Sequence, residues 1–477
     1  MPIDIKTATD QQKTNIRTDI NAQEQSTRLD LFTRKQYLGD NEPSRVISLI
    51  RPTTGYVTSP RPIVTNCTAA LSAEQVLTFS QSIKCTISGA VTAVMDWNPG
   101  PEPVLNASGV PTSWGNQKFN KGLSEIGMGI YLSAAANISL FELEVTTKLG
   151  GGTTNWRYVI NDGSLVDGWN HLRRFASSHA NTGGWGESDP EITRVRFIIV
   201  TTGAVNVYVD HVYGVERDKA SLVFMSDLSE KYFLEGTDLD GTPSGGLPDF
   251  TERNIPCVLA CLPGQWGSTA ARPTAAQLRT AISQGHVVGL HSLEGENTSA
   301  MSLDGIRNYA IKAVNKIKQE RIPFFPFRDA WFQNAGNMSA NQTGLDDIFL
   351  GLATWNANLN GMNCWPPINR RNIGRYPVHN NNDAATDTIF TTLYNTRQVA
   401  FHYTHYITHN AASTTNMVMA RWTYYLSKLD TAISEGWLEV VTPEILFRRA
   451  GLRLVSDHNR NFWEWRNIDG SIQRVLA

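Results

Sequence analysis

Residues 221–227 read SLVFMSD, a short apolar run that ends on a serine and an aspartate. Downstream of it, apolar runs of similar length alternate with amphipathic stretches. Repeats of this β-then-α kind indicate a parallel sheet with crossover helices, and their number favours a barrel. Strands are expected at 221–227, 255–262, 286–292, 322–327, 347–355, 398–407 and 437–442, and helices at 275–285, 304–321 and 417–436.

The segment from residue 60 to residue 217 has a different pattern. Short runs of β-branched and aromatic residues, such as ISLFELEVTT (138–147) and VNVYVDHVYGV (205–215), are separated by Gly, Asn, Ser and Pro. Such runs without helical periodicity predict an antiparallel β-sandwich or jelly roll. Large aromatic side chains in it either pack in the core or form a platform on which sugars stack. The tryptophans concerned are Trp97, Trp114, Trp156, Trp169 and Trp185.

The first 58 residues are polar and poor in aromatic residues, so they cannot bury much surface alone. We expect an arm or adaptor that orders against a partner or a symmetry mate, with simple disorder as the alternative. The predicted order of parts is an arm at 1–58, a candidate carbohydrate-binding β-sandwich at 60–217, a (β/α) barrel at 219–448 and a C-terminal extension at 449–477.

The composition excludes several classes of protein. The chain has 477 residues, enough for two or three domains, and its 42 basic and 44 acidic residues give a net charge of -2. It lacks the basic stripe that nucleic-acid binding requires. No stretch approaches the roughly 20 apolar residues of a membrane span, and we expect no cleavable signal peptide. The five cysteines are too scattered for a disulfide framework or a zinc site, so we expect them to be buried.

Polar side chains stand at the carboxyl ends of the predicted barrel strands, where the chemistry of such barrels lies. Asp227 closes the first strand and His291 the third, and Arg328 follows the run at 322–327. His402 and His405 lie on a late strand. Because a parallel barrel brings these strand ends to one rim, we expect a single polar cluster. Asp and His are ordinary ligands of a divalent metal ion, and a further His can act as a general acid.

The order of these motifs resembles the NodB-type polysaccharide deacetylase family. LVFMSD is similar to the first-strand motif of that family, SQGHVVGLHS to its histidine segment, FPFRDAW to its arginine motif, FHYTHYI to its late histidine motif and WLEVVTPEIL to its closing strand. The resemblance covers residues 220–448. It implies a distorted (β/α) barrel that removes acetyl groups from glycans with a metal-bound water.

The resemblance also implies roles for individual residues. Asp227 and His291 would bind a divalent metal ion, for which zinc is the expected identity. His405 would give a proton to the leaving group, with His402 as the fallback if the register differs. Arg328 would support the general base.

Two positions depart from the family pattern. Ser226 stands where the family has its base aspartate, and Gly295 stands where it has its second metal histidine. Glu294 and Glu296 are near enough in sequence to replace that ligand, and a carboxylate is acceptable to zinc and to harder metal ions. We therefore expect weak metal binding and slow or unconventional deacetylation.

The order of the parts resembles bacteriophage tailspike or tail-fibre proteins, which act on capsule or O-antigen. The resemblance implies a virion protein that acts outside the cell on a bacterial surface polysaccharide, forms a homotrimer and binds other virion tail proteins through its amino-terminal arm. It accounts for a chain without a signal peptide, since a virion protein is assembled in the host cytoplasm and released by lysis.

Two other functions stay open on the sequence. The barrel could have lost catalysis and serve as a glycan-binding receptor, which the departures at Ser226 and Gly295 favour. It could instead be a glycoside hydrolase or lyase, a capsule depolymerase, that uses carboxylates such as Glu230, Asp329 or Glu294. That chemistry needs two carboxylates about 5–9 Å apart.

Overall fold

The structure is a computed structural model, and the chain divides into two compact units, with the boundary between Arg217 and Asp218. Most of the arm predicted at 1–58 lies outside the described residues. So does Trp185, and of the side chains of Trp97, Trp114 and Trp156 nothing is described. The structure describes residues 44–50, 62–76, 82–97, 102–105, 111–115, 117–118, 123–149, 152–160, 165–175, 191–227, 230–295, 301–329, 345, 347–355, 362–363, 373–409, 416–450, 452–457, 460–466 and 472–476.

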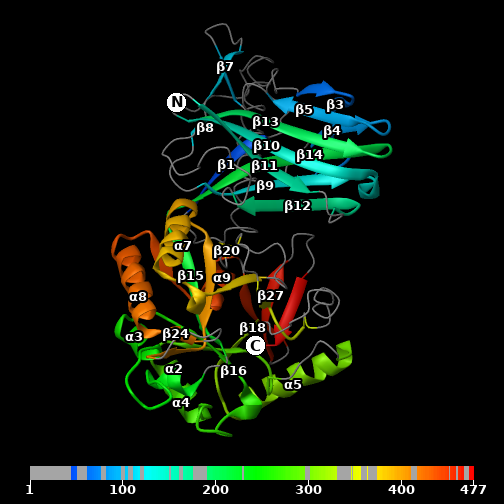
Figure 1. Cartoon of the computed structure of the whole chain (residues 1–477). Helices are drawn as coiled ribbons and strands as arrows, with labels where there is room; N and C mark the ends of the chain where they lie inside the picture. The colour runs from blue at the N-terminus through cyan, green and yellow to red at the C-terminus, as the bar shows by residue number, and fades with distance from the viewer. Residues whose placement is uncertain are drawn as a thin grey trace, which may run out of the picture. The chain divides into compact units, whose positions relative to one another are not determined.

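The first unit is built from antiparallel strands in two main sheets (Figure 1). One sheet has the order β12-β9-β14-β4-β3, with β1 paired to β14; the other has the order β11-β10-β13-β5-β2, with β8 paired to β13. The strands of the first sheet are β1 Ser44–Ile50, β3 Thr68–Ser72, β4 Ser82–Ile87, β9 Leu123–Leu132, β12 Gly168–Phe175 and β14 Val205–Arg217. Those of the second are β2 Ile63–Thr65, β5 Thr92–Trp97, β8 Gln117–Lys118, β10 Ile138–Leu149, β11 Gly152–Ile160 and β13 Glu191–Thr201. A separate hairpin joins β6 Glu102–Leu105 to β7 Pro111–Gly115, and η2 Ala135–Asn137 precedes β10.

Side chains from both sheets share one hydrophobic core. On β10, Phe141, Leu143 and Val145 are fully buried in it, and they alternate with Glu142 and Glu144 on the opposite face. This alternation is the period of two that a strand imposes on its side chains. The segment whose sequence predicted strands without helices therefore folds as an antiparallel β unit, as expected.

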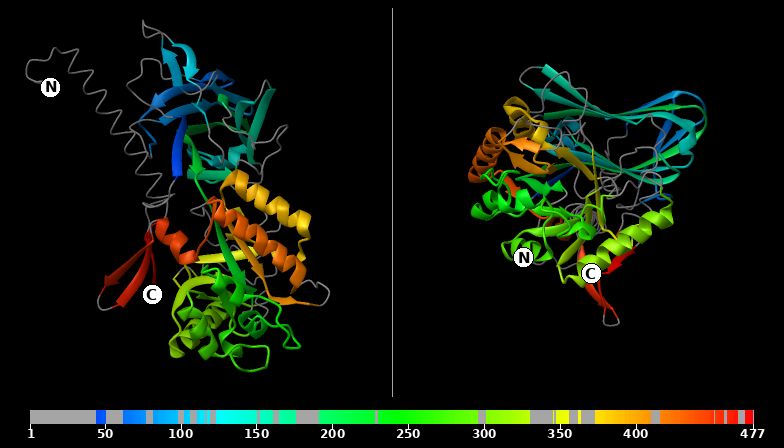
Figure 2. Two further views of the ribbon diagram at one scale, coloured as in Figure 1. Left: turned by 90° about the vertical axis from the view of Figure 1, so that its left-hand side faces the viewer. Right: turned by 60° about the horizontal axis from the view of Figure 1, so that its bottom comes forward.

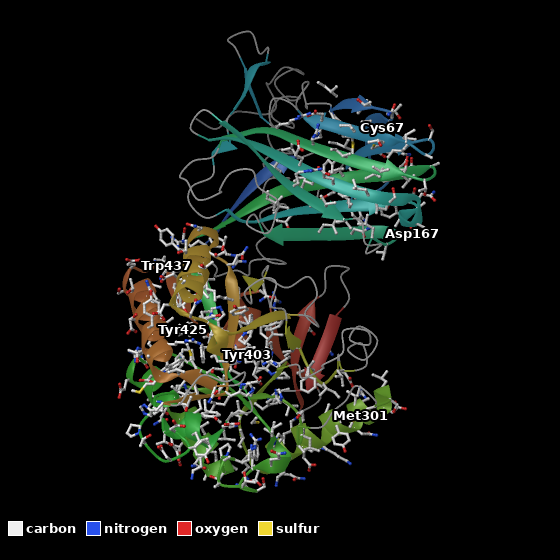
Figure 3. The ribbon with its side chains drawn as sticks, viewed as in Figure 1. Cys67, Asp167, Met301, Tyr403, Tyr425 and Trp437 are labelled. Carbon is white, nitrogen blue, oxygen red and sulfur yellow. The ribbon has the colours of Figure 1, made fainter. Side chains whose placement is uncertain are left out.

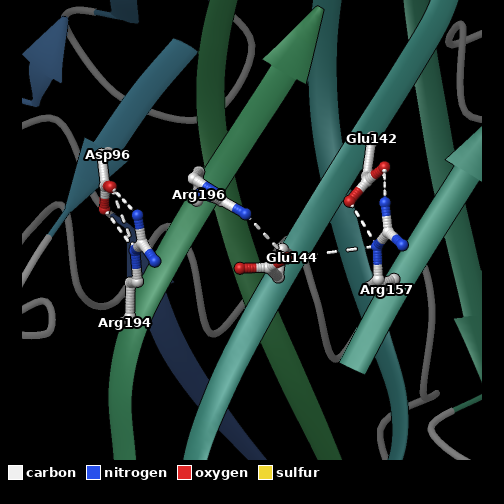
Figure 4. A network of polar contacts seen from close by, with 6 residues as sticks. All are labelled: Asp96, Glu142, Glu144, Arg157, Arg194 and Arg196. Carbon is white, nitrogen blue, oxygen red and sulfur yellow. Dashed lines mark hydrogen bonds and ion pairs between the residues drawn. The ribbon is translucent and has the colours of Figure 1, made fainter. Parts of the chain in front are cut away.

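The outer face of the second sheet carries a row of alternating charges (Figure 4). Arg157, Glu144, Arg196 and Asp96 lie opposite one another in register on β11, β10, β13 and β5. Arg196 Nη2 donates to Glu144 Oε2 at 2.9 Å, and Arg194 forms an ion pair with Asp96. Cross-strand pairs of opposite charge stabilise a sheet by about 0.2–1 kcal/mol each. The row therefore helps to set the register of four strands.

The second unit contains a closed ring of parallel strands (Figures 1 and 2). The ring runs β15-β16-β17-β18-β19-β21-β22 and closes because β22 also pairs with β15. The ring strands are β15 Ala220–Ser226, β16 Val258–Cys261, β17 Val287–Leu290, β18 Phe324–Asp329, β19 Gly351–Trp355, β21 Ile373–Pro377 and β22 Val399–Thr404. Attached to it or near it are β20 Met362–Asn363, β23 Tyr406–Thr408, β24 Asn416–Val418 and β25 Leu438–Val440. The β-then-α repeats thus produce an α/β barrel.

Helices connect the ring strands. Helix α4 begins at a capping box in which Thr274 and Gln277 bond to each other's main-chain N–H groups, and Ser302 caps α5 in the same way as Thr274 caps α4. Helices α7 and α8 lie side by side on the outside of the ring (Figures 1 and 2). The helices are α2 Lys231–Glu235, α3 Leu247–Glu252, η5 Pro263–Gln265, α4 Ala275–Ser283, α5 Leu303–Gln319, η8 Val378–Asn380, α7 Asp383–Thr396, α8 Met419–Ser434 and α9 Pro443–Arg449.

Each ring strand presents alternate residues to the interior. On β15, Val223 and Met225 belong to the core inside the ring. Phe224, which lies between them, faces the helices instead, where its ring lies 5.7 Å from that of Trp422 and 5.8 Å from that of Tyr425 on α8. Tyr425 is labelled on this helix in Figure 3. The next inward position after Met225 is Asp227, so the same alternation carries a carboxylate to the carboxyl end of the barrel.

The C-terminal residues form a small antiparallel sheet of β26 Arg453–Asp457, β27 Arg460–Arg466 and β28 Ile472–Leu476. Trp463 and Val475 are buried in the same core as Phe325 and Phe447 of the barrel. The Trp463 ring lies 5.5 Å from the ring of Phe325. The predicted extension at 449–477 is therefore packed against the barrel core.

None of the helices in the described part of the chain is both long enough and apolar enough to span a membrane.

Candidate active site

Asp227 is the centre of a buried polar cluster at the carboxyl end of β15. Its carboxylate is only 4% exposed, and three basic side chains approach it. His291 Nδ1 lies 2.9 Å from Asp227 Oδ1, Arg375 Nη1 donates to Oδ2 at 3.0 Å, and His405 Nε2 lies 3.7 Å from Oδ2. Burying a carboxylate this deeply costs free energy, which partners of opposite charge offset, and the guanidinium is the one partner that is always charged.

The ring of strands explains why these residues meet. His291 follows β17, and His405 follows β22, whose Tyr403 pairs in register with Met225 of β15. In parallel strands the carboxyl ends lie at one rim, so residues that follow three different strands come together. The sequence analysis predicted that Asp227, His291 and His405 would share this rim, and the structure places all three there.

Arg375 was not foreseen from the sequence. It lies on β21, where Ile373, two residues earlier, is in the interior core, so that the two share a face of the strand. The available signal was the alternation of Ile373, Arg375 and Pro377. It was hidden because the run is short and the residues before it, such as Arg370 and Arg371, are polar.

Aromatic rings hold the basic side chains in place. The Arg375 guanidinium carbon lies 4.1 Å from the centre of the Tyr403 ring, within the range of a cation–π interaction. The ring of His379, from η8, lies 5.7 Å from Tyr403 and 5.6 Å from His405. His405 is the most accessible member of the cluster, with 14% of its side chain exposed. It is therefore the group that a substrate can reach most readily.

His402, the fallback for His405, lies elsewhere. It is completely buried, and its Nδ1 is 2.9 Å from the hydroxyl of Tyr425 on α8. Its strand position puts it on the helix side of β22, one residue out of step with Tyr403. The structure thus brings His405, and not His402, to Asp227.

Ser226 is buried, and its hydroxyl is 3.5 Å from the main-chain oxygen of His405. A serine hydroxyl cannot accept a proton near neutral pH as a carboxylate would, so this position supplies no base. The side chains of Arg328, Asp329 and Glu296 lie outside the described residues, so the expected roles of these residues stay predictions.

The turn after β17 occupies the region expected to provide a further metal ligand. Gly295 has a left-handed backbone, with φ of 83°, and its N–H donates to the Ser292 hydroxyl at 2.8 Å. Glu294 is exposed, and a Cβ atom at Gly264 would overlap its side chain, so Glu294 lies against η5. In the part of the chain that is described, no group of three His, Cys, Asp or Glu side chains is arranged to hold a metal ion.

These residues do not fit the metal site that the resemblance implies. Both oxygens of Asp227 already face His291 and Arg375. A divalent ion bound to Asp227 would have to share this carboxylate with the positively charged guanidinium, which would repel it. The reaction proposed for this site therefore uses the side chains alone.

Glu230 is a further acidic group in this region, at the start of α2. Burial raises the pKa of Glu230 above its ordinary value; the nearby charge of Arg272 opposes this effect, and that of Asp227 adds to it. The same carboxylate contributes to raising the pKa of Tyr406, next to His405, although burial of the phenol is the larger cause. A carboxyl group with a raised pKa beside a polar cluster is a candidate for proton transfer.

No protein-family profile and no curated protein matches the chain. Among solved structures, the Xyl-CE4 domain of a multidomain xylanase from the hindgut metagenome of Trinervitermes trinervoides aligns with 12% identity over 53% of this chain and 100% of that one, with a TM-score of 0.33. A family 4 acetyl xylan esterase from Clostridium thermocellum, in complex with a cobalt ion, aligns with 17% identity over 48% of this chain and 90% of that one, with a TM-score of 0.30.

The solved structures that align with the chain also include a carbohydrate-binding module. A family 11 carbohydrate-binding module from Clostridium thermocellum, in complex with a β-1,3-1,4-mixed-linked tetrasaccharide, aligns with 11% identity over 37% of this chain and 88% of that one, with a TM-score of 0.20. Because all these similarities are weak, the functional argument rests on the site itself.

Proposed function

We propose that the chain is a hydrolase that removes acetyl groups from a polysaccharide. The observation that carries the proposal is the meeting of Asp227, His291 and His405 at the rim of a parallel barrel. The motifs that contribute these residues are the ones that resemble a polysaccharide deacetylase. The accessible His405 ring beside a buried carboxylate is suited to moving a proton.

The reaction is the addition of water to an acetyl carbonyl, followed by loss of the sugar oxygen or nitrogen. His405 takes a proton from the water as its oxygen bonds to the carbonyl carbon. The Asp227 carboxylate, 3.7 Å from His405 Nε2, faces the imidazolium that forms, and its ion pair with Arg375 limits how strongly its charge stabilises that cation. His405 then gives that proton to the sugar atom as its bond to the carbonyl carbon breaks, which releases acetate.

The test is acetate release from acetylated polysaccharides, with polymer length measured on the same samples. His405→Ala should lower the rate by about 10²–10⁴-fold, the usual contribution of a general acid or base. His409→Ala is the matched control, since His409 is an exposed histidine that binds the Pro243 oxygen and lies outside the cluster. Equal rates for the His405→Ala variant and the unsubstituted protein would exclude the proposed role, and shortened polymer without acetate would indicate a glycoside hydrolase or lyase.

The setting that we propose is a virion tail protein that acts on a bacterial capsule or O-antigen, as a homotrimer joined to other tail proteins by its amino-terminal arm. The support is the order of the parts, with an arm, a β unit and an α/β barrel in sequence. Light scattering of the purified protein tests the trimer. A monomer at micromolar concentration would contradict the proposed homotrimer and leave the barrel chemistry unaffected.

A second candidate is a glycan-binding protein without catalysis. The observation that favours it is that Ser226 stands at the expected position of the base while Arg375 neutralises the Asp227 carboxylate at the centre of the cluster. The two candidates differ in one measurement. A non-catalytic receptor would bind the polysaccharide, and neither acetate nor shortened polymer would appear in the reaction.

A further inference from the structure

We propose that the Arg375 guanidinium takes the place of a metal ion beside Asp227, so that this site works without a divalent cation. The inference deepens the proposed function and rests on it only for the identity of the reaction. It is an inference about the charge balance of the cluster, and it is tested by cation binding as well as by activity.

The charges at the centre of the cluster balance each other. Asp227 and Arg375 form an ion pair at 3.0 Å, and both are almost completely buried. Their charges cancel, and His291 and His405 complete the surroundings of the carboxylate. A metal-binding aspartate needs its negative charge to offset that of the cation. In this cluster that charge is already balanced.

The Arg375 side chain is held in one position. Its guanidinium lies against the Tyr403 ring, and its strand β21 is paired with β22 at Tyr376 and at Pro377. Only 5% of the residue is exposed. An arginine on the surface could move aside to admit an ion. Arg375 could do so only by losing its contact with the Tyr403 ring and its ion pair with Asp227. The guanidinium is therefore a fixed part of the site.

The turn after β17 does not supply the further metal ligand that the resemblance implies. The position expected to hold a second histidine is Gly295, within a turn closed by Ser292. Glu294 is exposed, and its main-chain oxygen accepts a hydrogen bond from the Gln265 side chain. Of the ligands that the resemblance implies, only Asp227 and His291 remain within the described residues. Two protein ligands leave most of a coordination shell to water.

The decisive experiment is a titration of the purified full chain with Co²⁺, followed by visible absorption and by calorimetry. The unsubstituted protein should show no stoichiometric binding up to millimolar Co²⁺. Arg375→Met, which keeps a long side chain without the charge, should bind Co²⁺ at least tenfold more tightly. Arg375→Lys is the matched control and should resemble the unsubstituted protein, because it keeps the positive charge.

Two further variants keep the test decisive. Adding Asp227→Asn to Arg375→Met should abolish the gain, because the gain depends on the released carboxylate. If Arg375→Met does not fold, Co²⁺ binding is compared between the unsubstituted protein and Asp227→Asn. Equal and negligible binding by these two proteins supports the inference. One equivalent of Co²⁺ bound to the unsubstituted protein with a Kd below about 10 µM, and lost in Asp227→Asn, overturns it.

Acetate release separates this inference from the proposed function. Acetate release that persists after treatment with a chelator supports both. Acetate release that requires an added divalent ion overturns the metal-independent site while the hydrolase stands. No acetate release under any condition, together with the expected Co²⁺ pattern, leaves the guanidinium inference supported and removes the hydrolase.

Discussion

Asp227 and Arg375 depend on each other to remain charged inside the barrel. Removing one partner of a buried ion pair leaves an uncompensated charge and costs about 3–5 kcal/mol, whereas replacing both by apolar residues of similar size is often neutral. We therefore expect Asp227→Ala and Arg375→Met each to lower the free energy of unfolding by about 3–5 kcal/mol. The double variant should lose much less than the sum. Urea unfolding of all four proteins measures this.

An exposed pair provides the comparison. Arg253 and Asp430 form an ion pair at 2.8 Å on the surface of the second unit, and such pairs contribute about 0–1 kcal/mol. Asp430→Ala should therefore change stability little. Additive losses in the Asp227 and Arg375 double variant would show that the two charges are not coupled.

His286 should make the stability of the second unit depend on pH. Burial lowers the pKa of His286 to about 4, and its ring accepts a hydrogen bond from the Cys257 N–H through Nδ1 while Nε2 lies 2.8 Å from the Thr251 hydroxyl. The folded state thus holds the neutral ring, and the unfolded chain binds the proton first as the pH falls. Stability should be complete above about 6.5 and decrease by up to about 3 kcal/mol as the pH falls to about 4.

The measurement is urea unfolding at pH 7 and at pH 4, with the unsubstituted protein and His286→Gln compared at both. The remaining histidines and carboxyl groups are common to the two proteins, so the difference between them isolates His286. The variant should lose less stability on acidification. A decrease of the same size in both proteins would show that His286 binds its proton equally well in the folded and unfolded states.

At the scale of the elements, Gly127 of β9 leaves the space that the Tyr213 ring of β14 occupies. It lies opposite Tyr213 in register, and a Cβ atom at position 127 would overlap the tyrosine ring, which is completely buried. Gly127→Ala should destabilise the first unit by about 1–3 kcal/mol, the usual cost of overpacking. Thermal unfolding of the variant would show the loss as a lower transition temperature.

Gly89 is the matched control for that substitution. It lies in the turn between β4 and β5, and no atom lies within 4 Å of the position that its Cβ would take. Gly89→Ala should leave stability unchanged or raise it by about 0.4–1 kcal/mol through the unfolded chain. Equal effects of the two substitutions would mean that the Tyr213 ring moves aside without cost.

The elements that the sequence predicted well are those with a strong internal pattern. Helix α5 and strand β15 were located to within about two residues, because a cap and an unbroken apolar run mark their ends. Strand β21 and helix α7 were missed: β21 is short and interrupted by Arg375, and the buried face of α7 contains threonines such as Thr386 and Thr396. Polar residues on a buried face weaken the periodicity from which an element is recognised.

The same limit applies to the site. Asp227, His291 and His405 end runs that the sequence marked as strands, so their meeting at one rim followed from the parallel arrangement. Arg375 belonged to no predicted element, and its contact with Asp227 spans 148 positions of the chain. A residue that contacts the site only because of tertiary packing is not marked by any local pattern in the sequence.

For the whole molecule, the boundary between the two units should be the preferred site of proteolysis. Strand β14 ends at Arg217 and β15 begins at Ala220, and Asp218 and Lys219 between them are exposed. Trypsin should cut after the exposed Lys219 before it cuts inside either unit, and mass spectrometry of the fragments would locate the cut. Early cuts within α4 or α5 would contradict the barrel as a compact unit.

The closure of the barrel has a consequence for how the protein is made. Ser226 pairs with Thr404, about 180 positions later in the chain, and strand β15 is buried along its whole length. At the usual rate of synthesis of about 5–20 residues per second, the ribosome needs roughly 10–35 s to deliver that partner. During this interval the apolar strand β15 has an unpaired edge on the nascent chain, and chaperones would be needed to keep it from aggregating. A chain cut short before β22 would contain Asp227 and His291 and still lack the rim that gives them a use.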